Sequence, residues 1–233
     1  MLAGIPIRLG LRIAETADCF QGFLLQQDCP SYDVCIREDE ARDYPLICPD
    51  GKLTAAAESY ILMAHVSRYL LKKHSVLMHG VSFCYRDKAW LISGPSGVGK
   101  TTQLRYWQEY WGEEIELISG DKCILKQEDN IFELYPSPWT GKEKDRGEAS
   151  GRLGGIILLK QADHNRIGFI STHEAIMPLF DQLLINGETE EELMQAGQIL
   201  DALLKTISVC LLENKGDPQS ALMTRNFIME NDL

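Results

Sequence analysis

LISGPSGVGKTTQL, residues 91–104, is the most informative stretch of the sequence, because residues 94–101 match the phosphate-binding pattern G-x-x-x-x-G-K-[ST]. An apolar segment, residues 89–92, precedes the pattern, and a segment with helical spacing, residues 100–111, follows it. Glycines allow backbone N–H groups to turn inward around phosphate oxygens, and the positive end of the following helix adds to the attraction. The stretch therefore predicts a strand, a phosphate-binding loop and a helix in succession.

The side chains of this loop have separate expected roles. Lys100 is expected to reach the β- and γ-phosphates of a nucleotide, and the Thr101 hydroxyl is expected to ligate Mg²⁺. Thr102 follows on the helix, where it faces the core or the base. The predicted nucleotide contacts in this stretch are Gly94, Ser96, Gly97, Val98, Gly99, Lys100, Thr101 and Thr102.

A carboxylate follows the next predicted strand. Residues 113–119 (EEIELIS) are expected to form the strand after the helix, which completes a strand–helix–strand unit with a parallel sheet, and Asp121 lies just past its end. Ligands of open α/β sheets bind at that edge. Asp121 can therefore hold Mg²⁺, directly or through water, or accept a proton from a hydroxyl group. The alternative is a turn residue that follows Gly120.

Composition and charge exclude several classes of protein. The chain has 233 residues, of which 45% are hydrophobic, and a formal net charge of −11, which disfavours binding to nucleic acid or to an anionic membrane. No apolar run approaches the roughly 20 residues that span a bilayer, and Arg8 and Arg12 interrupt any signal-peptide segment. Seven cysteines without a C-x-x-C pair argue against a disulfide framework or a zinc site. We expect a cytoplasmic protein with reduced thiols.

The remaining pattern predicts a mixed α/β chain. Residues 1–53 are expected to form a β-rich N-terminal segment, with strands within residues 5–13, 32–38 and 44–49, and residues 54–233 the larger domain. A helix is expected over residues 54–73. Two strand-like runs flank residues 86–88, which indicates a tight hairpin, so some neighbouring strands are antiparallel. Further strands are expected at 130–135, 153–160, 166–172 and 208–214, and helices begin near 171, 189 and 218.

His79 narrows the class of nucleotide-binding protein. If the hairpin is centred near Asp87, His79 lies opposite residues 95–96, so an imidazole stands beside the phosphate loop. A strand that pairs antiparallel to the strand before such a loop is unusual, because neighbours there are mostly parallel. The alternative is a buried strand histidine with no chemical role, and a register shift of one residue would turn the side chain to the other face.

The stretch HGVSFCYRDKAWLISGPSGVGKTT, residues 79–102, resembles the catalytic domain of HPr kinase/phosphorylase, a bacterial serine kinase. That family has a His-Gly pair on the strand before the loop, the loop itself, and two adjacent acids after the next strand. The corresponding positions here are His79-Gly80, residues 94–101 and Asp121, with Lys122 where the second acid would stand. The resemblance implies the phosphoenolpyruvate-carboxykinase-like nucleotide-binding fold, with a mixed sheet, for residues 54–233.

The resemblance also implies an activity. We expect an ATP-dependent kinase that uses Mg²⁺ and transfers the γ-phosphate to a serine-type hydroxyl of a protein, a peptide or a small molecule. Lys100, Asp121 and His79 would be its catalytic residues: Asp121 accepts the hydroxyl proton, and His79 orients the acceptor or senses the γ-phosphate. Because a second acid is missing beside Asp121, the alternative is a nucleotide-binding accessory protein of a peptide-modification system that transfers nothing itself. The family forms oligomers, so the resemblance allows a homo-oligomer, on which the residues themselves give no indication.

The loop YPSPWTGKEKDRGEASGR, residues 135–152, is a candidate for the acceptor side of the site. It gathers Lys142, Lys144, Arg146 and Arg152 in an otherwise acidic chain, and such cations can hold phosphate groups. Arg152 is the predicted phosphate ligand among them because it lies nearest the next strand. Trp139 either stacks on a base or walls an acceptor pocket, or it packs into the core beneath a solvated loop.

Overall fold

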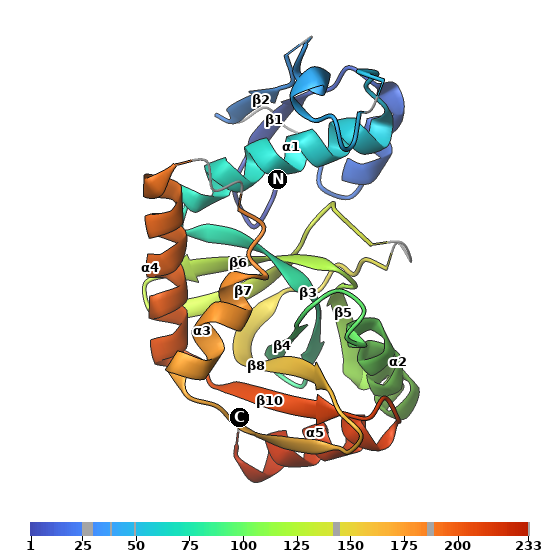
Figure 1. Ribbon diagram of the computed structural model, residues 1–233, viewed down its shortest axis with the longest axis vertical. Helices are drawn as coiled ribbons and strands as arrows, with labels where there is room; N and C mark the ends of the chain where they lie inside the picture. Colours follow the sequence, from blue (N-terminus) through green and yellow to red (C-terminus); the bar gives the residue numbers. More distant parts are fainter. Residues whose placement is uncertain (25–29, 38, 49, 142–144, 186–188, 233) are drawn as a thin grey trace.

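The computed structural model describes residues 1–24, 30–37, 39–48, 50–141, 145–185 and 189–232. It has a mixed α/β architecture, as the sequence predicts, with one large mixed sheet and a small N-terminal unit (Figure 1). The N-terminal unit lies at one end of the molecule, above the strands β3 (Ser75–Tyr85) and β6 (Lys122–Glu128) of the sheet. In the described part of the chain, none of the helices combines the length and the apolar character needed to cross a bilayer.

The large sheet contains both parallel and antiparallel pairs, as the sequence predicts. The strand after the phosphate-loop helix does not lie beside the strand before the loop, however: residues 115–119 pair antiparallel with residues 82–85, and residues 89–93 have residues 153–158 as their parallel partner. The pairings of the sheet run from β4 through β3, β6, β7 and β8 and return to β4, while β10 and β9 extend it beyond β8 and β5 pairs with β3. The strand bounds are β3 Ser75–Tyr85, β4 Lys88–Ser93, β5 Ile115–Ser119, β6 Lys122–Glu128, β7 Ile131–Pro136, β8 Gly151–Gln161, β9 Arg166–Phe169 and β10 Val209–Asn214.

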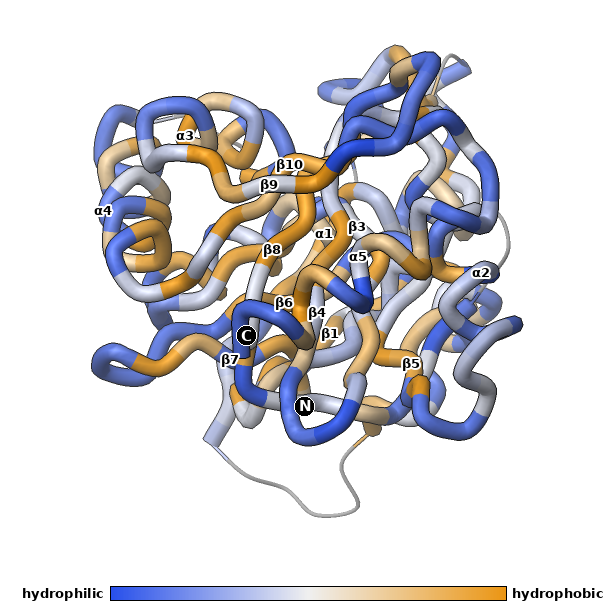
Figure 2. The backbone as a smooth tube through the Cα atoms, turned by 90° about the horizontal axis from the view of Figure 1, so that it is seen from below, coloured by the Kyte–Doolittle hydropathy of each residue, from blue (hydrophilic) through white to orange (hydrophobic). Residues whose placement is uncertain are grey.

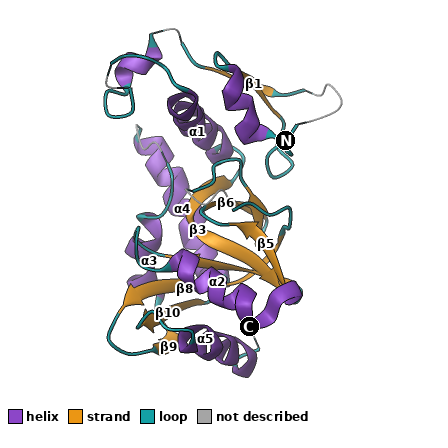
Figure 3. Cartoon of the chain, turned by 90° about the vertical axis from the view of Figure 1, so that its right-hand side faces the viewer, coloured by secondary structure: helices purple, strands orange, loops and turns teal. Residues whose placement is uncertain are grey.

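Helices cover both faces of this sheet. α2 and α5 lie side by side on one face, where Gln103 of α2 donates to Ser220 of α5 (Figure 3). α3 and α4 pack against the other face, and the strands β8 and β10 between the two layers are strongly hydrophobic (Figure 2). The helix bounds are α1 Ala55–Leu71, α2 Lys100–Trp111, α3 Thr172–Phe180, α4 Glu190–Thr206 and α5 Gln219–Glu230.

β3 and β4 form the predicted hairpin. Tyr85 pairs with Lys88, so the turn has two residues, and Arg86 adopts a positive φ of 60°. Two-residue hairpins favour positive φ because the twist of such a turn matches the twist of the strands. The register continues to Gly80 opposite Ser93, where β4 ends.

This register corrects the expected position of His79 by one residue. The hairpin does not place His79 opposite residues 95–96, because the chain leaves the sheet after Ser93. His79 pairs instead with Lys122 on β6, which runs along the other edge of β3. The imidazole nevertheless faces the phosphate loop across the cavity described below.

The N-terminal unit is less β-rich than its sequence suggests. Its strands β1 Ile7–Gly10 and β2 Tyr32–Cys35 form one parallel pair, and Ala14–Phe20 and Glu40–Asp43 are 3₁₀ helices. The third expected strand, at residues 44–49, forms turns up to Cys48, whose N–H donates to the carbonyl of Tyr44; residue 49 lies outside the described residues. Proline at position 45 removes a backbone donor that a strand would need.

α1 joins the N-terminal unit to the sheet. Thr54 caps this helix through a hydrogen bond from the N–H of Ala57, and the helix lies within the expected residues 54–73. The buried face of α1 contributes Ile61, Leu62 and Val66 to a hydrophobic cluster that also contains residues of β3 and β6. Glu58 on the same helix is buried and accepts hydrogen bonds from the segment that precedes the first 3₁₀ helix. One packed cluster therefore fixes the N-terminal unit against one face of β3 and β6.

Candidate functional site

The predicted phosphate loop connects β4 to α2. Gly94, Gly97 and Gly99 have φ values of 144°, 79° and 108°, which L-residues rarely adopt. A Cβ on Gly94 would also stand 3.0 Å from the carbonyl oxygen of Leu159 on β8. The backbone of the loop turns tightly and passes close to the sheet, and glycine is the residue that allows both.

The start of α2 presents backbone donors to the loop cavity. The first hydrogen bond within the helix runs from Gln103 N–H to the carbonyl of Gly99. Over the described residues, no acceptor within the chain faces the N–H groups of Lys100, Thr101 and Thr102. Such N–H groups at the positive end of a 12-residue helix form a site for phosphate oxygens.

Lys100 lies folded inside its own loop. Its side chain is 7% exposed, and Nζ donates to the carbonyl oxygens of Gly94 (2.8 Å) and Pro95 (3.0 Å). Burial lowers the pKa of the Lys100 ammonium group, and the nearby carboxylate of Asp121 opposes that effect. The loop carbonyls therefore hold a cation where the phosphates of a nucleotide would bind.

Asp121 occupies an interruption between two strands that share one partner. β5 and β6 both pair antiparallel with β3, and Gly120 and Asp121 separate them. The carbonyl of Asp121 accepts from Gly80 N–H (2.8 Å), and the Ser119 hydroxyl accepts from Lys122 N–H (3.2 Å). The position just past β5 agrees with the sequence prediction, although the chain then continues directly into β6.

The imidazole of His79 and the ammonium group of Lys122 hold the carboxylate of Asp121. His79 Nε2 lies 3.3 Å from Oδ1, and the Nζ atom of Lys122 contacts Oδ2. Burial by itself would raise the pKa of Asp121, but the hydrogen bonds from His79 and Lys122 outweigh it and lower the pKa to about 2. Asp121 is therefore ionised at neutral pH.

The loop and Asp121 face one another across a cavity of about 790 Å³. Most of the predicted site residues line it, whereas Val98 is buried behind the loop and Gly94 contributes its carbonyl to Lys100. The lining residues are His79, Ser96, Gly97, Gly99, Lys100, Thr101, Thr102, Gly120, Asp121, Lys122, Thr140, Gly141 and Asp145.

The candidate acceptor loop reaches this cavity with its middle part. Thr140, Gly141 and Asp145 line the wall next to Asp121. Behind them, Gly120 N–H donates to the carbonyl of Asp145 (2.9 Å), which ties the loop to the end of β5. Lys142 and Lys144, which the sequence analysis placed here, lie outside the described residues.

Trp139 and Arg146 face the N-terminal unit and do not line the cavity. Trp139 is 6% exposed, donates from Nε1 to the carbonyl of Ser59 (2.9 Å), and packs edge-on against Phe20. Arg146 Nη1 donates to the carbonyl of Cys19 (3.2 Å). The core alternative for Trp139 is therefore the correct one, and both side chains anchor the loop.

Arg152 is far from the phosphate loop, which corrects its predicted role. β8 runs parallel to β4, and Ser93, where the loop begins, pairs with Leu158. Arg152 stands six residues before Leu158, or about 20 Å along the strand. Its side chain is exposed at the opposite end of the sheet. The position of Arg152 near the start of β8 in the sequence does not indicate which end of this strand faces the site.

Several residues at the site are not predicted by the sequence. Gln161 Nε2 donates to the carbonyl of Gly97 (3.2 Å), and Gln182 Oε1 lies 3.1 Å from Nδ1 of His79. The sequence marks Lys122 only as the position of a missing acid. These residues lie many positions from the loop in the sequence, and no local pattern marks them, so only the fold brings them to it.

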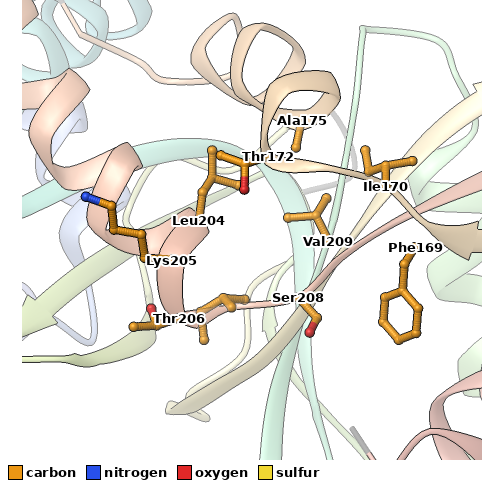
Figure 4. A pocket seen from close by; sticks show the side chains of 10 residues that line it. Phe169, Ile170, Thr172, Ala175, Leu204, Lys205, Thr206, Ser208 and Val209 are labelled. Atoms are coloured by element: carbon orange, nitrogen blue, oxygen red, sulfur yellow. The ribbon is translucent and has the colours of Figure 1, made fainter.

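A second hollow, of about 230 Å³, lies between β9, β10 and the helices α3 and α4 (Figure 4). Ile170, Val209 and Ala175 turn toward its interior, and Lys205 points away along α4. None of the site residues predicted from the sequence lines it. The phosphate-loop cavity is therefore the candidate functional site.

Comparisons with known proteins give little further information. No protein-family model and no curated protein matches the sequence. Among solved structures, the chain is similar to the HPr(Ser) kinase/phosphatase from Coxiella burnetii, at 14% sequence identity and a TM-score of 0.36, over 67% of this chain and 99% of that one. A function for this chain is therefore inferred from the residues of its own cavity.

Proposed function

We propose that this protein is an ATP-dependent kinase that transfers a phosphoryl group to a serine-type hydroxyl of a protein, a peptide or a small molecule. One observation carries the proposal. A phosphate loop and the first N–H groups of α2, which have no acceptor among the residues that the structure describes, stand with a buried lysine on one side of a cavity. On the other side is a carboxylate that His79 and Lys122 keep ionised. Phosphoryl transfer needs a site that binds the phosphates and an anionic group that orients the acceptor hydroxyl, and the two must lie close together.

The residues present fit a Mg²⁺–nucleotide complex, which supplies the phosphoryl group that is transferred. Lys100 and the N–H groups at the start of α2 would hold the phosphates, and Thr101 and Asp121 would hold the metal ion. Among the described residues, no group of three or more His, Cys, Asp or Glu side chains could hold a metal ion. That agrees with Mg²⁺, which in proteins is commonly bound by one or two carboxylates together with substrate phosphates.

The chain's own groups then have distinct tasks. Lys100 and the α2 N-terminus stabilise negative charge on the transferred phosphoryl group and on the nucleoside diphosphate that leaves. Asp121 orients the acceptor hydroxyl and accepts its proton as the oxygen bonds to phosphorus. Because the pKa of Asp121 is about 2, its contribution is more orientation than proton abstraction. His79 and Lys122 fix the direction of that carboxylate.

The direct test is transfer from labelled ATP to a panel of serine-containing peptides and small hydroxyl compounds. We expect Lys100→Ala to lose both nucleotide affinity and transfer, and Asp121→Asn to retain nucleotide affinity while transfer falls by about two to three orders of magnitude. Asp201→Asn, on the exposed side of α4, serves as the matched control. Transfer by Asp121→Asn at the parental rate would refute the assigned role of Asp121.

A second candidate is a nucleotide-binding accessory protein without transfer activity. The observation that favours it is the contact of Lys122 with Oδ2 of Asp121, which places a cation where a second carboxylate could otherwise take part. The two candidates differ in one experiment. The accessory protein binds nucleotide with an affinity that depends on Lys100, and no acceptor becomes labelled.

A further inference from the structure

One edge of β3 changes partner where the phosphate loop departs. β4 covers this edge up to Gly80, and beyond it residues 182–184, which follow α3, take its place. Leu184 N–H donates to the carbonyl of Leu77 (2.8 Å), and His79 N–H donates to the carbonyl of Gln182 (2.9 Å). A segment about one hundred residues distant in sequence therefore completes the strand edge beside the site.

The pairing aligns three side chains in a row. The antiparallel bridge between Met78 and Leu183 puts Gln182 directly opposite His79, and Lys122 of β6 is opposite His79 on the other edge. Residues directly opposite in antiparallel strands project from the same face of the sheet. Lys122, His79 and Gln182 therefore project together on the face that carries the cavity.

Both nitrogens of the His79 ring have a partner. Nδ1 lies 3.1 Å from Gln182 Oε1, and Nε2 lies 3.3 Å from Asp121 Oδ1. The outer torsion of a histidine side chain is broad, so the fold of β3 by itself does not fix the ring plane. A hydrogen bond at Nδ1 fixes it and leaves Nε2 directed at Asp121.

Gln182 is itself well fixed. Its side chain belongs to a residue that is 7% exposed, and its backbone N–H donates to the carbonyl of Leu179 at the end of α3 (3.0 Å). A buried amide is costly unless it is hydrogen-bonded, so the contact with His79 is favoured over solvation of either group. A rigid support of this kind is what a precisely placed site residue requires.

We propose that Gln182 is a positioning residue, which holds the His79 imidazole so that Nε2 supports the carboxylate of Asp121. The proposal rests on the proposed function, since the carboxylate is the group that orients the acceptor. With His79 at Oδ1 and Lys122 at Oδ2, the carboxylate cannot rotate freely, and its remaining lone pairs are directed at fixed points in the cavity. Loss of the Gln182 contact frees the ring, so that of these two contacts only the one from Lys122 still fixes the carboxylate.

The test uses two variants of similar shape. Gln182→Met removes the acceptor, and Gln182→Glu keeps an oxygen at the same place. We expect Gln182→Met to lower kcat about tenfold with the KM for ATP within about twofold of the parent, since a small misplacement of a reacting group has an effect of at least this size. Gln182→Glu should retain most of kcat. Gln195→Met, on α4 where Gln195 contacts Glu191, is the control.

A double-mutant cycle separates positioning from general damage to the fold. In a chain that already carries His79→Ala, Gln182→Met should lower kcat no further, because its effect passes through the ring. An additional tenfold loss in that background overturns the proposal, as does a Gln182→Met variant with parental kcat.

A spectroscopic measurement does not depend on activity. In protein labelled with ¹⁵N-histidine, the Nδ1 resonance of His79 should have a similar chemical shift in the parent and in Gln182→Glu and a clearly different one in Gln182→Met. An Nδ1 chemical shift that is unchanged in Gln182→Met overturns the proposal. If the resonance behaves as expected but the parent labels no acceptor, the proposed kinase function is wrong while the support of His79 by Gln182 stands.

Discussion

Gly141 lies against the side chain of Asp121, so that a Cβ on residue 141 would stand 3.1 Å from both Cβ and Cγ of Asp121. That spacing is tighter than an ordinary carbon–carbon contact. The loop comes to this position from Trp139, which is anchored on Ser59 of α1. Because residue 141 is a glycine, the loop can lie over the Asp121 carboxylate, the group that we propose orients the acceptor hydroxyl.

Gly141→Ala should reduce transfer without loss of nucleotide binding. The added methyl group must push the loop or the Asp121 carboxylate aside by a few tenths of an ångström, and we expect about a tenfold lower kcat. Steady-state kinetics together with nucleotide titration check this. Gly197→Ala, on α4 with no neighbour near its Cβ position, should leave both quantities unchanged. Equal activity of the two variants contradicts the assigned position of the loop.

Gly80→Ala should destabilise the protein. A Cβ on this residue would lie 2.6 Å from Cδ1 of Leu91 and 2.8 Å from the carbonyl oxygen of Ile92, and a backbone atom in the middle of a sheet cannot easily move. We expect a loss of about 2 kcal/mol in the free energy of unfolding, measured with urea. Gly168→Ala, also on a strand but with open space around its Cβ position, should change it by less than about 0.5 kcal/mol.

The loop and Asp121 could be predicted from the sequence because their signals are local. Glycine spacing, the apolar strand before the loop and the helix after it all occur within residues 89–121. The bounds of α2 agree with the prediction for the same reason, since Gly99 and Gly112 flank a helical pattern. Structural features that are formed by residues close to one another in the sequence can be predicted from the sequence alone.

The support of the carboxylate could not be predicted in this way. Gln182 meets His79 through an antiparallel bridge between segments about one hundred residues apart, and Lys122 contacts Asp121 where β5 and β6 are interrupted. Strand order across a sheet is not encoded in local periodicity, and an error of one residue in register changes the face of every side chain. The Arg152 prediction was wrong because the direction of β8 relative to β4 was unknown.

Arg152→Ala should leave nucleotide binding unchanged. The side chain stands about 20 Å from the loop end of its strand, beyond the reach of any direct contact with phosphate. Titration with a fluorescent ATP analogue at fixed salt concentration should give a Kd within about twofold of the parent, whereas Lys100→Ala weakens binding by at least about tenfold. A large loss of affinity in Arg152→Ala would mean that β8 does not pair with β4 in the register described.

Trp139→Phe should affect stability and leave nucleotide affinity unchanged. The variant keeps an aromatic ring against Phe20 but loses the hydrogen bond from Nε1 to Ser59, which costs about 1 kcal/mol in the free energy of unfolding. Urea unfolding and nucleotide titration of the same preparations check both expectations. If affinity falls about tenfold while stability is retained, the indole stacks on the base after all.

The low pKa of Asp121 predicts how stability depends on pH. The group has a pKa of about 2 in the folded protein against 3.8 as an ordinary value, so between these values the unfolded chain binds more protons. The stabilisation by ionised Asp121 is therefore complete well above pH 3.8 and is lost as the pH falls toward 2. Relative to Asp121→Asn, the parent should lose about 1 kcal/mol of unfolding free energy between pH 6 and pH 3.

Lys122→Met tests the cause of this low pKa. The ammonium group on Oδ2 is one of the two contacts that favour the ionised carboxylate, so its removal should raise the pKa of Asp121 toward its ordinary value. The loss of stability between pH 6 and pH 3 should then become smaller than in the parent. An unchanged pH dependence in Lys122→Met would show that His79 alone holds the carboxylate in its ionised state.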